Sequence, residues 1–259
     1  MTLIAVTVAE AVSAGRRRCF DEGQFRGMAD YLFETAPGEE PGPQALVARQ
    51  APGWTLPVHF HMQYQFQVVL RGSGTLGKHV LAPGSVHYTS PQSGYGPILA
   101  GEDGLDYFTI RVLTDKGAWY LPEARAYMER GLFKEQQWGP APDEESAWGW
   151  QTLIPFRPDG LGAWACTGQA NTPYACKEPH SDAGRFHSVI RGSFRLGNRV
   201  LPPGSCVYWS PPDSPPTFTA LEEKSLMIAV QFPGEALRHH VPPELRVAPS
   251  ARGTPLSPN

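Results

Sequence analysis

Residues 58–68 read Val-His-Phe-His-Met-Gln-Tyr-Gln-Phe-Gln-Val, and polar side chains alternate with apolar ones through the whole stretch. Successive side chains of a β-strand point to opposite faces. The stretch, continuing to Gly72, therefore predicts a strand with one apolar and one polar face. A strand that only closed a sandwich would not need five polar side chains in a row. We therefore take the polar face as the candidate site: His59, His61, Gln63, Gln65 and Gln67.

The same strand recurs 120 residues later, which indicates an internal duplication. Fifteen of the 26 residues from 66 to 91 are identical to the residues 120 positions further on, without a gap. The matches include Arg71-Gly72-Ser73 with Arg191-Gly192-Ser193, and Pro83-Gly84-Ser85 with Pro203-Gly204-Ser205. A repeat of this length is a whole domain rather than one unit of a solenoid. We therefore expect two domains.

Composition favours packed β-domains. Hydrophobic residues make up 41% of the 259 residues, and 27 Gly and 27 Pro are scattered between short apolar runs, as in β-sandwiches and barrels. The net charge of −3 gives no electrostatic reason to expect nucleic acid or a membrane as a partner. No apolar window reaches the roughly 18–20 residues of a membrane span. The four cysteines lack CxxC pairing, which predicts reduced thiols in a cytoplasmic protein.

The order of apolar runs and turn residues suggests domain boundaries. We expect a first barrel, with an N-terminal extension, over residues 1–115 and a second barrel over residues 145–232. Between them, residues 116–144 carry apolar side chains spaced by three and four from Leu121 to Leu132, which predicts a helical linker. The Pro-rich residues 233–259 are expected to form a surface tail with a short helix near its start. The segment from Phe25 to Phe33 fits a short helix and an irregular segment equally well.

Spaced glycines and histidines give the polar strand a resemblance to a known superfamily. Residues Gly53-x5-His59-x-His61-x3-Gln65-x6-Gly72 resemble the first motif of the cupins, G-x5-H-x-H-x3/4-E-x6-G, with Gln65 in place of the usual Glu. Together with the duplication, the chain is similar to a bicupin over about residues 45–113 and 165–232. The resemblance implies an all-β fold of two tandem double-stranded β-helix (jelly-roll) barrels, each of which can hold one ligand.

The cupin resemblance also implies a metal centre. In that family the residues at His59, His61 and Gln65 converge inside the barrel on one divalent transition metal, such as Fe, Mn, Ni or Zn. The position of a further histidine ligand of the family falls near Tyr95, so that ligand is absent. Replacing the carboxylate by Gln65 would leave a bound ion with more net charge and more open positions. Tyr95 is a candidate catalytic acid or orienting group, or an aromatic that covers the barrel end.

The second copy departs further from the family motif, because the three residues that align with the metal-ligand positions are Pro179, Ser181 and Arg185. The resemblance therefore implies no metal site there. Arg185 and His187 share a strand face in the same register as the polar face of the first copy. We expect them to present a cation to a carboxylate substrate or simply to fill a degenerate barrel.

Two classes of function fit these features. The first is a metal-dependent enzyme acting on a small oxygenated or carbonyl-containing molecule. Dioxygenase-type oxidative cleavage is the first expectation, since two histidines leave positions for substrate and O₂, and metal-dependent hydrolysis or isomerisation is an alternative. The second class is a non-catalytic small-molecule-binding or sensing protein, in which Gln63, Gln65 and Gln67 form a hydrogen-bonding lining. Many cupins associate through their sheets, so the resemblance also implies a homodimer.

Overall fold

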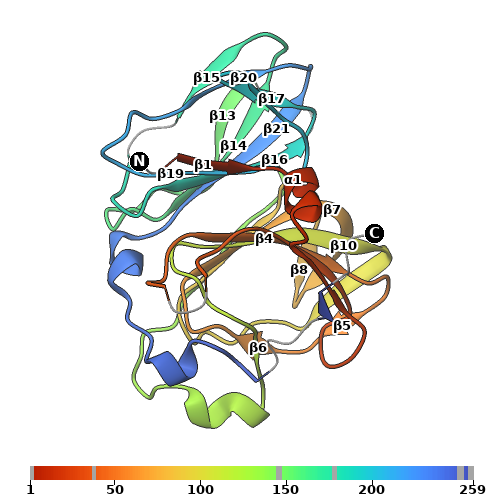
Figure 1. Cartoon of the computed structure of the whole chain (residues 1–259), viewed down its shortest axis with the longest axis vertical. Coiled ribbons are helices and arrows are strands. Elements are labelled where there is room, and N and C mark those ends of the chain that lie inside the picture. The colour runs from red at the N-terminus through yellow and green to blue at the C-terminus, as the bar shows by residue number, and fades with distance from the viewer. Residues whose placement is uncertain (1–2, 37–38, 144–147, 177–179, 250–253, 256–259) are drawn as a thin grey trace.

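The strands form two barrels that stack along the long axis of the molecule (Figure 1). The computed structural model describes residues 3–36, 39–143, 148–176, 180–249 and 254–255. No helix within these ranges is long and apolar enough to cross a membrane. The first barrel is the lower one in Figure 1, and the second barrel is the upper one.

A ten-stranded sheet and a two-stranded sheet build the first barrel. The two-stranded sheet pairs β11 (Trp119–Tyr120) with β6 (His59–Phe60). At the side of the large sheet, β5 (Thr55–Leu56) pairs with β10 (Ile98–Arg111), and β8 (His79–Leu81) pairs with β7 (Gln65–Leu76). The main order of the large sheet is β12 (Gln136–Gly139), β9 (Val86–Thr89), β7 (Gln65–Leu76), β10 (Ile98–Arg111), β4 (Gln44–Gln50), β3 (Gly27–Phe33), β2 (Arg17–Phe20) and β22 (Thr254–Pro255).

The second barrel contains a six-stranded and a four-stranded sheet. The six-stranded sheet has the order β1 (Leu3–Val6), β19 (Cys206–Trp209), β16 (Arg185–Arg191), β21 (Ser225–Gln231), β14 (Gly162–Gly168) and β13 (Gly149–Ile154). The four-stranded sheet has the order β15 (Pro173–Ala175), β20 (Thr217–Ala220), β17 (Phe194–Leu196) and β18 (Arg199–Leu201).

The sequence repeat reappears as a repeat of strand register. In the first barrel Gly74 pairs with Leu81, and in the second barrel Phe194 pairs with Leu201, 120 residues further on in each case. Gly72 and Gly192 both have positive φ, 80° and 63°, where a side chain would be strained. A Cβ atom on Gly72 would also lie 2.2 Å from the Gly104 carbonyl oxygen. Gly72 lies inside β7 beside an irregularity in the pairing with β10, and the backbone at this position requires glycine.

Each end of the chain contacts the barrel that is more distant in sequence: the N-terminal strand pairs with the second barrel, and the segment after β21 packs on the first. Strand β1 precedes the first barrel in sequence but pairs with β19 of the second barrel. The helix α1 (Val8–Ser13) follows it and begins with a capping box between Thr7 and Glu10. After β21 the chain returns to the first barrel through the 3₁₀ helices η2 (Gly234–Arg238) and η3 (Pro243–Leu245). The tail is thus part of the packing of the first barrel.

The expected helical linker is much shorter than the spacing predicts. Among the described residues 116–143, only the 3₁₀ helix η1 (Glu123–Tyr127) is helical. It lies between β11 and β12, which pair with strands of the first barrel. Leu121, Ala124 and Met128 pack against a small apolar cluster that contains Trp119. The spacing by three and four therefore reflects this one packed turn, which a 3₁₀ helix provides as well as an α-helix does.

One apolar core lies between the two barrels. Phe66 of β7 meets Phe232 with ring centroids 4.9 Å apart, and Phe186 of β16 meets Phe232 at 5.9 Å. Phe33 stacks on Phe186 at 6.3 Å. The apolar face of β7 thus packs between the barrels, and its polar face turns into the first barrel.

Candidate functional site

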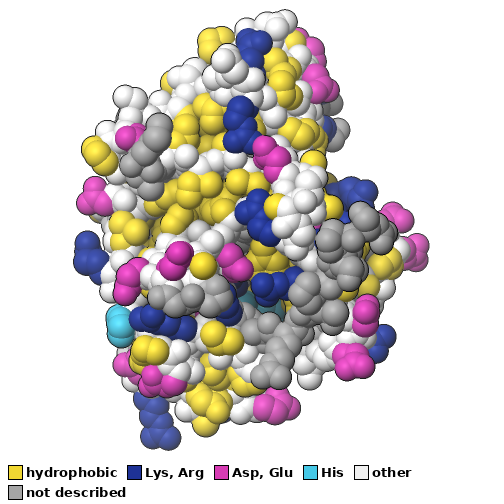
Figure 2. Space-filling view, in the orientation of Figure 1, with side chains coloured by type: hydrophobic (Ala, Val, Ile, Leu, Met, Phe, Trp, Pro, Cys, Tyr) yellow, Lys and Arg dark blue, Asp and Glu magenta, His cyan; other side chains and the backbone are white. Residues whose placement is uncertain are grey.

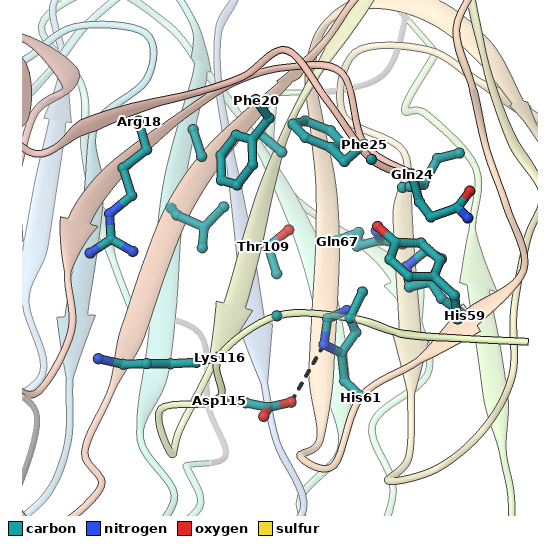
Figure 3. Close-up of a pocket in the computed structure, with 18 of the residues that line it drawn as sticks. Arg18, Phe20, Gln24, Phe25, His59, His61, Gln67, Thr109, Asp115 and Lys116 are labelled. Atoms are coloured by element: carbon teal, nitrogen blue, oxygen red, sulfur yellow. Dashed lines mark ion pairs between the residues drawn. The ribbon is translucent and has the colours of Figure 1, made fainter. Parts of the chain in front are cut away.

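A cavity of about 420 Å³ opens inside the first barrel (Figure 3). In Figure 3 the rings of Phe20 and Phe25 lie on the side opposite His61 and Asp115. The apolar and aromatic part of the lining includes Phe20, Phe25, Tyr31, Leu46, Leu56, Tyr107 and Tyr120. The polar part includes Gln44, His59, His61, Gln67, Tyr95, Thr109, Arg111 and Asp115.

The polar stretch does not form one continuous strand. Strand β6 ends at Phe60 and β7 begins at Gln65, with a bend between them. The alternation nevertheless places His59, His61 and Gln67 on the cavity. Gln63 lies in the bend, is buried without lining the cavity, and its Oε1 has no hydrogen-bond partner among the described residues. The prediction for Gln63 as a substrate-binding residue therefore fails because the chain bends there.

His59, Tyr95 and Gln65 form a hydrogen-bonded chain with consistent donor and acceptor roles. His59 Nδ1 lies 2.7 Å from the Pro57 carbonyl oxygen, so this nitrogen donates and Nε2 is an acceptor. The Tyr95 hydroxyl lies 2.9 Å from His59 Nε2 and donates to it. Gln65 Nε2 in turn donates to the Tyr95 oxygen over 2.6 Å. Tyr95 is thus bound to both His59 and Gln65 through its hydroxyl group.

Arg111 is the central cation of the site. Its side chain extends from the end of β10 and is only 3% exposed. Nη2 donates to Gln65 Oε1 over 2.5 Å and lies 3.1 Å from His61 Nδ1. Nη1 donates to Gln44 Oε1 over 2.5 Å. The guanidinium therefore lies between two of the three residues that were expected to bind a metal.

Asp115 supplies the nearby negative charge. Its Oδ2 lies 3.4 Å from His61 Nδ1 and accepts from the Met62 backbone N–H over 3.0 Å. Oδ1 of Asp115 and Nε of Arg111 have no hydrogen-bond partner within the described residues. Both atoms are buried, and a buried polar atom without a partner costs free energy.

The buried histidines of the first barrel are held neutral. Burial, with a smaller contribution from His61, lowers the pKa of His59 to about 3. Burial and then the Arg111 charge lower the pKa of His61. Burial also lowers the pKa of His87 to about 4. At neutral pH the buried guanidinium of Arg111 is therefore charged, and the imidazoles of these buried histidines are neutral.

His87 fixes the orientation of Gln67. Its Nε2 lies 3.2 Å from Gln136 Oε1, whose own Nε2 donates to the Gly94 carbonyl. Its Nδ1 lies 3.0 Å from Gln67 Oε1. A neutral imidazole has one N–H, so the His87 ring donates to one of these two amide oxygens and holds the side chain of Gln67 in place.

Comparison with known proteins identifies the fold. No protein-family model matches the sequence, and no curated protein matches it. Among solved structures, the bacterial pirin YhhW from Escherichia coli in complex with nickel(II) is 11% identical, with a TM-score of 0.56, covering 90% of this chain and 99% of that chain. A putative dioxygenase from Nostoc punctiforme is 12% identical, with a TM-score of 0.58, covering 100% and 88%. An oxalate decarboxylase is 11% identical, with a TM-score of 0.55, covering 93% and 79%.

These neighbours are cupin-fold proteins. The chain has the cupin fold. This confirms the all-β fold class expected from the motif and the repeat. At such low identity the likeness concerns the fold alone, and the chemistry of the site depends on the residues of this chain.

The residues of the first barrel do not fit a metal ion in this arrangement. Within the described ranges, no three His, Cys, Asp or Glu side chains come together closely enough to hold one. The lone pair of His59 Nε2 accepts from Tyr95, and Gln65 Oε1 accepts from Arg111. A divalent cation would also face the buried guanidinium, and like charges repel strongly at low dielectric. The predicted ligands are brought together, but their binding atoms are already engaged.

In the described part of the second barrel, side chains fill the interior beside the residues that align with the polar face. Arg185 and His187 are fully buried on β16, and an apolar cluster that includes Phe194 and Phe218 fills the interior beside them. Arg185 donates to Gln231 Oε1 over 2.8 Å and lies 4.5 Å from the Trp164 ring centroid. Of the two expectations for this barrel, the filled interior is the one that these contacts support. Pro179 lies outside the described residues.

The polar alternation at residues 58–68 gives no sign of several charged residues of the site: Arg18, Arg111, Asp115 and Lys116. A signal for Arg111 was present, because Leu105, Tyr107, Thr109 and Arg111 alternate along one strand face. Arg18 and Lys116 extend on the same side of the cavity in Figure 3. Figure 2 shows Lys and Arg side chains beside the hollow on this face.

Proposed function

We propose that the first barrel binds a small organic anion, with a carboxylate on an aromatic or apolar body, and that it does so without a metal. The observation that carries the proposal is Arg111, a buried guanidinium on the cavity wall. Its side-chain hydrogen-bond partners among the described residues are the neutral Gln44, Gln65 and His61. Arginine is suited to carboxylates because its planar fork can donate two hydrogen bonds.

The rest of the cavity suits such a ligand. Aromatic rings such as Phe20, Phe25 and Tyr107 provide apolar walls for the body of the molecule. Arg18 and Lys116 line the same cavity, and Glu22 and Glu34 line it as well, with Glu34 3.9 Å from Arg18. The charge that would select an anion is therefore that of the buried Arg111. The volume of about 420 Å³ is in the range of small-ligand sites.

Binding of benzoate compared with benzyl alcohol tests this proposal by calorimetry. We expect benzoate to bind and benzyl alcohol, which has the same ring without the charge, to bind at least tenfold more weakly. Replacement of Arg111 by Met should weaken benzoate binding about 10- to 100-fold, because a hydrogen bond to a charged group is worth roughly 1.5–3 kcal/mol. Arg71→Met is the matched control, since Arg71 is exposed and lies outside the cavity. Equal binding of the two probes would refute the proposal.

The metal-dependent enzyme expected from the motif, with dioxygenase-type cleavage as its first form, is the competing function. Metal analysis of the purified protein separates the two. A stoichiometric transition metal that is lost in a His59→Ala, His61→Ala double variant would replace our proposal by the metal-dependent one. A metal-free protein that binds benzoate would support the anion-binding cup.

A further inference from the structure

A cluster of reactive side chains lies in the second barrel, apart from the anion cup. Cys176 follows directly after β15, the edge strand of the four-stranded sheet. Its Sγ lies 3.3 Å from Nε2 of His187 and 3.4 Å from Nη1 of Arg185. His187 and Arg185 are fully buried, whereas Cys176 retains 7% exposure. The sulfur thus lies between two nitrogen groups at the margin of the barrel interior.

The protonation of His187 is decided by its surroundings. Burial, and then the charges of Arg185 and His180, keep the pKa of His187 well below its usual value, so the ring is neutral. Its Nδ1 is buried and has no hydrogen-bond partner within the described part of the chain. An orphaned buried N–H is rarer than an orphaned acceptor, so the single proton belongs on Nε2. His187 therefore donates to the sulfur.

Two donors thus converge on one sulfur. Arg185 brings a permanent positive charge, which Trp164 covers on one face at 4.5 Å, and His187 brings an N–H. Donors and a positive charge near a thiol stabilise its thiolate, which is the nucleophilic form. The other two buried cysteines differ, because burial in apolar surroundings raises the pKa of both Cys166 and Cys206 to about 12.

We propose that Cys176 is a thiolate and the oxidation-sensitive residue of this chain, with a hydroperoxide as its oxidant. The thiolate sulfur attacks one peroxide oxygen, the O–O bond breaks, and a sulfenic acid, Cys–S–OH, forms while hydroxide leaves. The sulfur loses two electrons and the peroxide gains them. This site is independent of the anion cup of the first barrel and requires no ligand there.

The protein provides its own comparison, because it has four cysteines and none of them is in a disulfide. We expect brief exposure to hydrogen peroxide, with dimedone present to trap sulfenic acid, to label Cys176 at least tenfold more than the more exposed Cys19, as measured by peptide mass spectrometry. The rate of alkylation of Cys176 by iodoacetamide should rise with a midpoint at least one pH unit below the roughly 8.5 of a free thiol.

Variants identify the cause of the reactivity. His187→Gln and Arg185→Met should each move the alkylation midpoint of Cys176 upward and leave that of Cys19 unchanged, and Cys166→Ser should change neither. If a variant does not fold, the pH dependence of Cys176 alkylation in the unmodified protein tests the proposal by itself. Labelling of Cys176 no faster than Cys19, or a midpoint at or above about 8.5, would overturn the proposal.

Discussion

At the scale of single residues, the site depends on buried groups whose protonation is fixed by burial. Arg111 donates to the neutral Gln65, and both its guanidinium and the Asp115 carboxylate lie close to Nδ1 of His61. His59 remains neutral so that it can accept from Tyr95. The donor and acceptor roles of His59, Tyr95 and Gln65 are thus fixed by one another.

The neutral histidines predict a stability that falls in mild acid. The pKa values of His59 and His87 are about 3 and about 4 in the folded protein, below the value of roughly 6.5 for an unfolded chain. As the pH drops from 6.5 towards 4, the histidines of the unfolded chain therefore bind protons while those of the folded protein stay neutral. The stability that is present above pH 6.5 is lost over this range. We expect the free energy of unfolding to fall by roughly 1 kcal/mol per pH unit for each histidine between pH 6 and pH 5.

Urea unfolding at half-unit steps of pH measures this slope. His87→Asn should reduce the slope by the share of one histidine. Tyr120→Phe, in the same barrel, should change the level of stability but not the slope, because the pKa of Tyr120 is about 12. A stability that stays flat from pH 6.5 to pH 5 would contradict the neutral state of these histidines.

At the scale of elements, the tail after β21 stabilises the first barrel. Val241 and Ala248 pack with Phe60, Met62 and Trp119 in a small apolar cluster. Backbone hydrogen bonds join Lys116 to Arg246 and Ala248, and His239 Nε2 donates to the Met62 carbonyl over 3.0 Å. A Pro-rich segment that the sequence marks as a surface tail is therefore held by buried contacts over residues 239–248.

Two valines of this tail give a matched test. Val241 is 5% exposed and Val247 is 54% exposed. Val241→Ala should lower the free energy of unfolding by about 1.5 kcal/mol, because two buried methyl carbons are removed at about 0.8 kcal/mol each. Val247→Ala should stay within about 0.5 kcal/mol of the parent. Chemical denaturation measures both, and equal effects would mean that the tail is not packed in solution.

At the scale of the whole molecule, the core between the barrels makes them one cooperative unit. Phe186 meets Phe33, Tyr208 and Phe232, and strands of both barrels contribute to the same buried cluster. Neither barrel could separate without exposing this apolar face to water. The pairing of β1 with the second barrel and the packing of the tail on the first barrel also link the two barrels.

Phe186→Ala should therefore destabilise both barrels together, by about 3–5 kcal/mol. Hydrogen exchange in rising denaturant can follow β7 of the first barrel and β21 of the second in one sample. We expect the protection of both strands to be lost at the same, lowered denaturant concentration. A shift confined to β21 would show that the barrels unfold independently.

The sequence by itself determined the periodic features of this protein. The alternation at residues 58–68 gave the polar face, and the identities at a spacing of 120 predicted a repeat that the strand register reproduces. Local periodicity is enough here because a strand or a turn depends mainly on its own side chains. Where the local spacing was ambiguous, it did not predict the element that forms. The segment that includes Met28 and Tyr31 is strand β3. The helical part of the expected linker is a single short 3₁₀ helix.

Only the tertiary structure decided what the polar face does. β10 pairs with β7 so that Ile110 lies opposite Phe66, and the next residue, Arg111, therefore reaches Gln65 from 46 positions away. In the same way, barrel closure brings Cys176 to His187. Contacts of this kind depend on which strands pair and in which register, and that is set by the packing of the whole chain rather than by any local pattern.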